Sequence, residues 1–204
     1  MQSIEVAQPA FFSPLIRRYT LQEFWALAEP EDRYHYDLIG GCLFMVPPPA
    51  PPHGTIDARL AKSLYEFLLG NKIEGEVHHP REPIYRSLES PTYLEPDMMY
   101  VSQELARSMG TKRTSADIVF EYASKSTAIY DRTTKADTYL ALGVRELWII
   151  DSSTKTIEVR HAVTHKNAPA WEVQGYSVGD SAESTVLPGW RVSVEELFEG
   201  LTEE

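Results

Sequence analysis

The chain has 204 residues, 43% hydrophobic and 24% charged, a composition that excludes a disordered or fibrous protein and fits a globular domain. Its net charge of −11 argues against a protein that coats nucleic acid through a broad basic surface, because phosphate binding depends on clustered Lys and Arg. The single cysteine excludes an internal disulfide, and the sequence predicts neither a signal peptide nor a bilayer-spanning segment, so we expect a cytoplasmic protein without a membrane partner.

We expect a single domain over residues 1–204. Residues 1–18 form an extended N-terminal arm in this interpretation, and residues 19–204 form the core. The core begins with a helix over 20–29, because Thr20 and Glu23 have the spacing of a capping box and apolar residues gather on one side of the segment.

A hairpin and a long helix follow. Two β-rich runs around a Gly-Gly pair predict a hairpin over 34–46. The proline-rich segment 47–52 reads as a stiff extended connector. An apolar stripe at helical spacing, with Gly70 placed to stop it, predicts a helix over 53–71.

The second half of the chain has mostly strand patterns. The helical segments are 131–144, which Gly143 ends, and the terminal 194–201. Strands are expected over 76–86, 93–103, 117–123, 146–151, 156–163 and 171–178. This order predicts an α/β or α+β fold in which helices pack on a sheet.

Two carboxylates stand inside strand patterns. Asp97 follows Pro96, and Glu121 interrupts the apolar run that starts at Ile118. An isolated ionised carboxylate is expensive to bury, so each needs a cation, a metal ion or a place at the end of the sheet. Two carboxylates on neighbouring strands make a hard oxygen site that suits Mg²⁺, and a nearby lysine would complete the groups needed for phosphodiester hydrolysis. A salt-bridged or edge position for Glu121 remains the alternative.

The helix after Glu121 carries three polar residues on one face. Asp131, Lys135 and Tyr139 are spaced at i, i+4 and i+8, so their side chains point the same way. This face is the first place to look for the lysine of such a site.

Five motifs follow one another along the chain. They are YDLIGG (36–41), P-x3-P-x-H ending at His53, EPD (95–97), VFEYASKST (119–127) and DRTTKADTYLALGVRELWIID (131–151). In this order they resemble the Uma-two family of restriction endonucleases, within the PD-(D/E)XK nuclease superfamily, over nearly the whole chain. The resemblance implies a restriction-endonuclease-like α/β core, in which a mixed β-sheet is flanked by α-helices. It also implies an endonuclease that cuts DNA with Mg²⁺, for which Mn²⁺ can substitute, and that acts as a homodimer.

The resemblance assigns roles to single residues. Asp97 matches the motif aspartate and Glu121 the second acidic metal ligand. The superfamily's usual lysine lies two residues after that acid, where this chain has Ala123. Lys135 on the following helix is our first choice for the missing lysine, and Lys125 is the second.

Further residues have more open roles. Asp37, where the family usually has a glutamate, is a third metal ligand or a polar hairpin residue. His53 contacts a scissile phosphate, shapes the cleft or only begins its helix. Tyr139 and Asp131 would support the site from the helix face. The missing strand lysine leaves a second hypothesis, a catalytically degenerate nuclease fold that serves as a binding or assembly module, and the sequence does not separate DNA from RNA or branched substrates.

Overall fold

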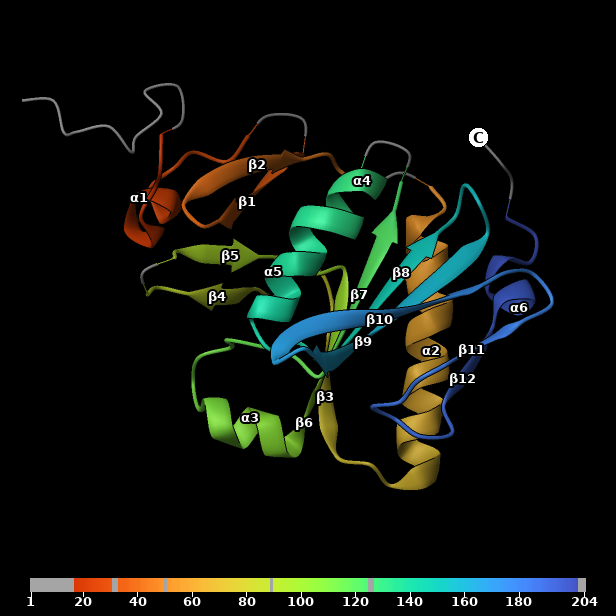
Figure 1. Ribbon diagram of the computed structural model, residues 1–204. Coiled ribbons are helices and arrows are strands. Elements are labelled where there is room, and N and C mark those ends of the chain that lie inside the picture. Colours follow the sequence, from red (N-terminus) through yellow and green to blue (C-terminus); the bar gives the residue numbers. More distant parts are fainter. Residues whose placement is uncertain (1–16, 31–32, 50, 89, 125–126, 202–204) are drawn as a thin grey trace, which may run out of the picture.

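The structure is a computed structural model that describes residues 17–30, 33–49, 51–88, 90–124 and 127–201 (Figure 1). The N-terminal arm expected over residues 1–18 therefore lies almost wholly outside the described residues, as does Lys125. The fold is a mixed α/β arrangement in which sheets are flanked by helices, as the sequence predicted.

A six-stranded mixed sheet forms the centre, in the order β10-β9-β8-β7-β6-β3. Only β7 and β8 run parallel; all the other neighbours in this sheet are antiparallel. The strands are β3 (Gly75–His78), β6 (Met98–Ser102), β7 (Ile118–Ala123), β8 (Glu146–Asp151), β9 (Thr156–His165) and β10 (Ala168–Tyr176).

A helical crossover joins the two parallel strands, as parallel pairing requires. It consists of α4 (Ala128–Tyr130), the π-helical turn η1 (Asp131–Lys135) and α5 (Ala136–Ala141), and Gly143 ends it with a φ of +85°. The sequence predicted this helix from residue 131 and missed both its first turn and the π-helical geometry. π-Helical turns are rare and are often found at functional sites.

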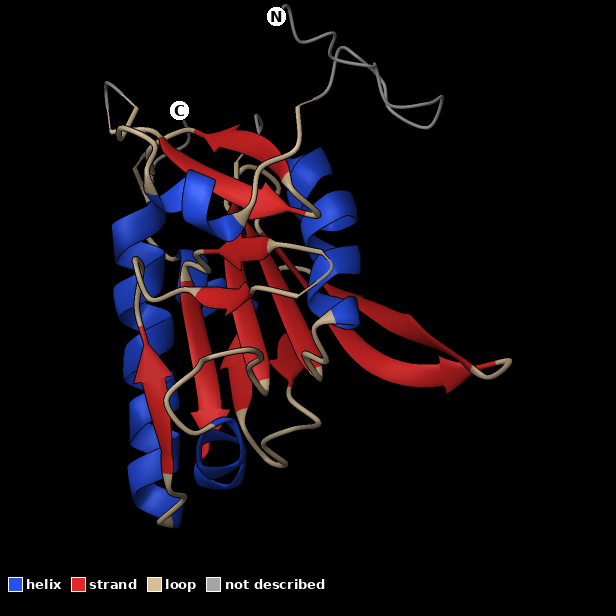
Figure 2. Cartoon of the chain, turned by 90° about the vertical axis from the view of Figure 1, so that its left-hand side faces the viewer, coloured by secondary structure: helices blue, strands red, loops and turns tan. Residues whose placement is uncertain are grey.

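Side chains of β7 alternate between the two faces of the central sheet. Phe120 and Tyr122 belong to the cluster that contains the long helix α2 (His53–Asn71), while Val119 and Ala123 belong to the cluster on the α5 side. Glu121 has the same parity as Val119 and Ala123, so its side chain points toward α5. Figure 2 shows the strands between these two helices.

The helix α2 matches the predicted range and buries Ile56, Leu60, Leu64 and Leu68 against the sheet. Buried residues of the C-terminal segment, including Trp190, complete this cluster. That segment comprises β11 (Ser181–Glu183), β12 (Arg191–Ser193) and α6 (Val194–Phe198). The short β11–β12 pair was not predicted.

A second, antiparallel sheet stands beside the central one, in the order β2-β1-β5-β4. Its first hairpin confirms the prediction, because Gly40 and Gly41 adopt φ values of +56° and +82°, which favour glycine in a tight hairpin turn. The strands are β1 (His35–Ile39), β2 (Cys42–Val46), β4 (Ile84–Arg86) and β5 (Thr92–Leu94).

This second sheet corrects two predicted strands. The segment 76–86 is divided between β3 and β4, and the segment 93–103 between β5 and β6, with each half in a different sheet. Pro96 offers no backbone N–H to a ladder and lies at the second break. The chain crosses from one sheet to the other there, and Asp97 occupies the crossing.

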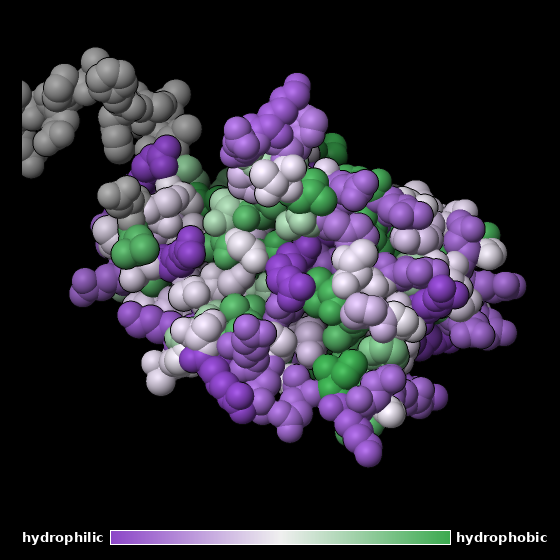
Figure 3. Space-filling view, turned by 60° about the horizontal axis from the view of Figure 1, so that its bottom comes forward, coloured by the Kyte–Doolittle hydropathy of each residue, from purple (hydrophilic) through white to green (hydrophobic). Residues whose placement is uncertain are grey.

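Smaller differences concern the surface elements. The first helix, α1 (Leu21–Trp25), has its predicted capping box but ends four residues early, and α3 (Gln103–Met109) occupies the end of what was predicted as strand. The β9–β10 hairpin extends away from the body of the molecule (Figure 2). Polar side chains are interspersed with small apolar areas on the face shown in Figure 3.

Candidate active site

Glu121 is the centre of the buried polar cluster. Its Oε2 accepts a hydrogen bond from Lys135 Nζ at 3.0 Å, and its Oε1 accepts one from the Tyr139 hydroxyl at 2.5 Å. All three residues are at most 3% exposed. The Glu121 side chain, which points from β7 toward α5, therefore meets the helix face predicted from residues 131–139. Lys135 reaches Glu121 from the crossover helix, whereas Ala123 occupies the strand position of the superfamily's usual lysine.

Lys135 has further acidic neighbours. Its Nζ lies 3.5 Å from Asp37 Oδ2 and 3.9 Å from Asp131 Oδ1. Asp37 on β1 also accepts a hydrogen bond from the Tyr130 hydroxyl at 3.1 Å. Both sheets and the crossover helix thus contribute to one charge cluster.

The carboxylates outnumber the cations in this cluster, and their negative charge raises the pKa of Lys135. Burial by itself would lower the pKa of Lys135, but Asp37, Glu121, Asp131 and Asp97 outweigh it and hold that pKa well above its ordinary value. The lysine is therefore a fixed ammonium ion.

Burial is the main cause that raises the pKa of Glu121 well above its ordinary 4.5, against the opposing charge of Lys135. Burial also raises the pKa of Asp131. Because several carboxylates share one ammonium, an additional positive charge would be stabilised here, whether it arrives as a proton or as a metal ion.

Asp97 is held from two sides in the crossing between the sheets. Its Oδ1 lies 2.9 Å from His53 Nε2, and its Oδ2 accepts a hydrogen bond from the Tyr122 backbone N–H at 2.8 Å. Burial acts to raise the pKa of Asp97, but the contacts with His53, Lys135 and Tyr122 lower it overall. The lowered pKa keeps Asp97 ionised. Its side chain is 24% exposed, so the carboxylate is also accessible.

His53 begins α2 and packs edge-on against the Tyr122 ring, with the ring centroids 4.7 Å apart. Burial lowers its pKa, but the Asp97 carboxylate more than compensates and raises it overall. The Tyr122 hydroxyl in turn donates to Asp57 Oδ1 at 3.0 Å, one turn along α2. This network fixes the orientation of Asp97.

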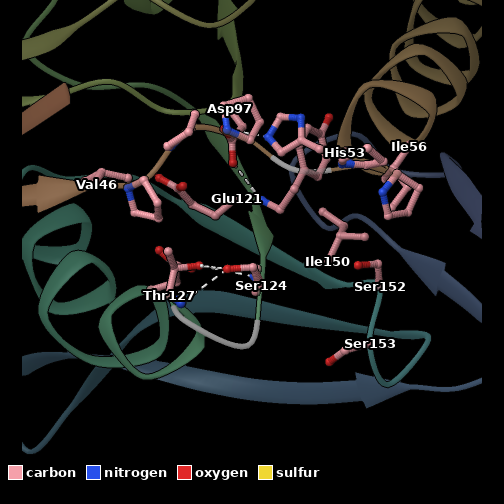
Figure 4. Close-up of a pocket in the computed structure, with 18 of the residues that line it drawn as sticks. Val46, His53, Ile56, Asp97, Glu121, Ser124, Thr127, Ile150, Ser152 and Ser153 are labelled. Atoms are coloured by element: carbon pink, nitrogen blue, oxygen red, sulfur yellow. Dashed lines mark hydrogen bonds and ion pairs between the residues drawn. The ribbon is translucent and has the colours of Figure 1, made fainter. Parts of the chain in front are cut away.

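A cavity of about 580 Å³ opens over these side chains (Figure 4). Asp97, Glu121, Asp131, Lys135 and His53 line it, but Asp37 does not. The cavity lies at the carboxyl ends of β7 and β8, where ligands commonly bind in open α/β sheets.

Comparison with known proteins agrees with this geometry. The Uma2 family, described as "Putative restriction endonuclease", matches residues 21–195. The chain belongs to the Uma2 family. No curated protein matches it.

A crystal structure of "a putative nuclease belonging to DUF820" from Anabaena variabilis ATCC 29413 is similar to this Uma2 chain. The two share 18% sequence identity with a TM-score of 0.70, and the match covers 88% of this chain and 97% of that one. At this identity the similarity shows the fold alone, and it confirms the predicted restriction-endonuclease-like core, a mixed sheet flanked by helices.

Most of the predicted site residues of the Uma2 chain come together. Asp97, Glu121 and Lys135 line one cavity, and Asp37 reaches Lys135 from the second sheet. Within the described part of the chain, no three His, Cys, Asp or Glu side chains form a group that could hold a metal ion by themselves. A metal ion bound to Asp97 and Glu121 would therefore take its other ligands from water or substrate, as Mg²⁺ usually does.

Two tyrosines of the site were missed. Tyr122 and Tyr130 look like core residues in the sequence, since a tyrosine in an apolar strand or helix gives no sign of where its hydroxyl points. Lys135 is buried and Arg132 pairs with Asp151 and Glu158, so these two neighbouring cations do not form an exposed basic patch. Among the described residues, no helix has the length and apolar character needed to cross a membrane.

Proposed function

We propose that this Uma2 protein is a metal-dependent endonuclease that hydrolyses phosphodiester bonds of DNA. Asp97 and Glu121 hold Mg²⁺, for which Mn²⁺ can substitute, and Lys135 positions the attacking water. The observation that carries the proposal is the contact between Lys135 Nζ and Glu121 Oε2 at 3.0 Å in a cavity that Asp97 also lines.

The donor set suits a divalent cation. Asp97 and Glu121 offer hard carboxylate oxygens, and each oxygen with one hydrogen-bond partner retains a further lone pair. The surplus of carboxylates over cations supplies the electrostatic attraction. A bound Mg²⁺ would polarise the phosphate and lower the pKa of a coordinated water.

The chain's own residues orient these groups. Tyr139 and Lys135 hold the two oxygens of Glu121, while His53 and the Tyr122 N–H hold those of Asp97. Lys135 is too firmly protonated to act as a general base. The ammonium group can instead orient a water or stabilise negative charge that develops on the phosphate.

Asp37 has a different role in this proposal. Its carboxylate contacts Lys135 and Tyr130 and lies outside the lining of the cavity. It therefore holds Lys135 in place, while the third acidic ligand position expected for it would be filled by water. Asp131, which does line the cavity, supports Lys135 from the same helix.

Plasmid nicking tests the proposal. We expect wild-type protein to nick plasmid with Mg²⁺ or Mn²⁺ and not with EDTA, and we expect Asp97→Ala and Lys135→Ala to lose at least about a hundredfold in rate. Lys62→Ala is the matched control, because the Lys62 side chain is 74% exposed on α2 and pairs only with Glu66 at 3.7 Å among the described residues. Unchanged activity in Asp97→Ala would contradict the assignment.

The degenerate-module hypothesis rests on Ala123 and on the acidic balance of the chain. The contact of Lys135 with Glu121 supports the catalytic proposal against the first of these two observations. Calorimetric titration with Mn²⁺ discriminates further, since a degenerate module would bind DNA or a partner without binding the metal.

Oligomeric state is a separate proposal. A homodimer would place two sites on the two strands of a duplex. Analytical ultracentrifugation with and without DNA tests this expectation. The cytoplasmic location expected from the sequence also stays a prediction.

A further inference from the structure

The loops after β7 and β8 build one polar wall of the cavity. The two strands pair in parallel with Ala123 opposite Asp151, so the loops that follow them leave the sheet at the same edge. The described residues of these loops that line the cavity carry hydroxyl groups or an ammonium group; they are Ser124, Thr127, Ser152, Ser153 and Lys155. In Figure 4 the labelled hydroxyl residues lie on the opposite side of Glu121 from Asp97 and His53.

Other parts of the lining are apolar. The proline-rich segment that precedes α2 contributes several rings, and α2, β8 and the C-terminal segment contribute aliphatic and aromatic side chains. These residues are Val46, Pro47, Pro48, Pro49, Pro51, Pro52, Ile56, Ile150, Phe198 and Leu201. A phosphate backbone matches the hydroxyl and lysine wall, and a nucleobase matches the apolar surface.

The depth of the carboxylates limits what can reach them. The side chains of Glu121 and Lys135 are only 3% and 4% exposed, so a phosphate must enter the cavity to approach them. A cavity of about 580 Å³ has the volume of a site for one small organic ligand, comparable to one or two nucleotides. In a duplex, each phosphate is accompanied by the stacked and paired strands, which slow its entry into such a cavity.

The charges of the residues that line the cavity also disfavour a duplex. Four carboxylates, those of Glu95, Asp97, Glu121 and Asp131, line the cavity, against two lysines and two histidines, which are Lys135, Lys155, His35 and His53. Tracking a duplex backbone requires many phosphates to be neutralised by Lys and Arg. This lining supports one or two phosphate contacts, which rely on a bound divalent cation.

We propose that the cavity accepts an unpaired DNA strand, in which one nucleotide places its base against the proline and aliphatic surface and its flanking phosphate beside Lys155. The inference rests on the proposed nuclease function and names its substrate class. An unpaired strand presents one phosphodiester at a time, so the inference does not depend on a dimer.

A set of three oligonucleotides of the same sequence tests the substrate class. They are a single strand, the intact duplex and a duplex with a central unpaired bubble, each incubated with Mg²⁺. We expect the single strand and the bubble to be cut at least about tenfold faster than the duplex, because unpairing and unstacking oppose access of a paired strand. Cuts in the bubble should fall within the unpaired region, whereas a duplex cut as fast as the single strand would overturn the inference and leave the proposed function intact.

Binding separates the two proposals further. Fluorescence anisotropy with the same oligonucleotides in Ca²⁺ should show at least about tenfold tighter binding of the single strand. If no DNA is cut but this preference is found, the proposed function fails and the inference about the occupant stands. Equal binding of single strand and duplex would overturn the inference.

Two lysines provide a matched pair for the phosphate contact. Lys155 and Lys166 both lie in hairpin turns with positive φ, 51° and 48°, but only Lys155 lines the cavity. Asn tolerates this conformation, so Lys155→Asn and Lys166→Asn make the same change in charge without added strain. Lys155→Asn should weaken single-strand binding about fourfold at 0.15 M salt and reduce the salt slope by about 0.7, as expected for one lost phosphate contact. Lys166→Asn should change neither, and equal behaviour of the two variants would overturn the assignment of the polar wall.

Discussion

Replacement of Lys135 by methionine removes the ammonium ion while keeping a long apolar side chain. In the wild-type protein this ion lies 3.0 Å from Glu121 and 3.5 Å from Asp37. At an effective dielectric constant of about 20, such pairs are worth about 5.5 and about 4.7 kcal/mol before desolvation is counted. Desolvation of the ammonium offsets much of this, but the carboxylates left behind remain buried and unpaired.

We therefore expect Lys135→Met to lower the free energy of unfolding by about 3–5 kcal/mol, the usual cost of removing one partner of a buried ion pair. The loss should be greatest in EDTA at pH 8 and smaller in Mg²⁺, because the cation binds the folded state and compensates the carboxylates. It should also shrink as the pH falls, since protonation of Glu121 removes the unpaired charge.

Urea unfolding followed by tryptophan fluorescence measures these losses, because Trp148 and Trp190 are both buried in the core. Lys62→Met is the control: its exposed ion pair with Glu66 should cost less than about 1 kcal/mol. A double variant, Lys135→Met with Glu121→Gln, should lose less than the two single variants together, because it removes both charges. A loss below about 1 kcal/mol for Lys135→Met in EDTA would refute the account of Lys135 as the ion that balances this cluster.

Tyr139→Phe removes one hydrogen bond to Glu121 and should lower the free energy of unfolding by about 1–3 kcal/mol, measured by urea unfolding; a change near zero would mean that this hydroxyl does not support the carboxylate. Burial raises the pKa of Glu121 and Asp131 above their ordinary 4.5 and 3.8, so without metal their contribution to stability is greatest below those values and is lost as the pH rises through the folded-state pKa. Mg²⁺ displaces the Glu121 proton, so its affinity in calorimetric titrations should increase as the pH rises above the ordinary 4.5 of this carboxyl, with proton release; a flat profile would argue against Glu121 as a ligand. Glu146 accepts hydrogen bonds from Trp148 Nε1 and from a C-terminal loop on the α2 side of the sheet, so Glu146→Gln should cost about 1.5–3 kcal/mol of stability while nicking by the folded fraction remains intact.

Local patterns were sufficient for much of the fold. The glycine pair at 40–41 and the apolar stripe of 53–71 each have short-range signals that tertiary packing does not override. The prediction of one strand over 93–103 was wrong because strand propensity does not reveal to which sheet a strand belongs. Pro96 marks the break, but only the tertiary structure shows that the two halves pair with different partners.

For the candidate site, too, the sequence predicted the local features and missed the long-range contacts. The i, i+4, i+8 spacing was enough to predict that Asp131, Lys135 and Tyr139 share one helix face. The side of the sheet toward which Glu121 points became clear only from the packing of β7. The contact between Asp37 and Lys135 joins the second sheet to the crossover helix across 98 positions of sequence, and the hydroxyl of Tyr122 on β7 meets Asp57 on α2. Such contacts have no local signal, so the sequence left the role of Asp37 open.

Lys135 comes from the crossover helix and not from β7, so the candidate site can form only after the chain has folded. In a strand, an acid and a lysine two positions apart would be neighbours even in a partly formed chain. Here Glu121 and Lys135 are 14 positions apart, on a strand and on the crossover that must dock against it. A nascent or locally unfolded chain therefore carries every residue of the site but cannot assemble it. If the proposed nuclease function holds, the chain would stay inert until its crossover helix is in place.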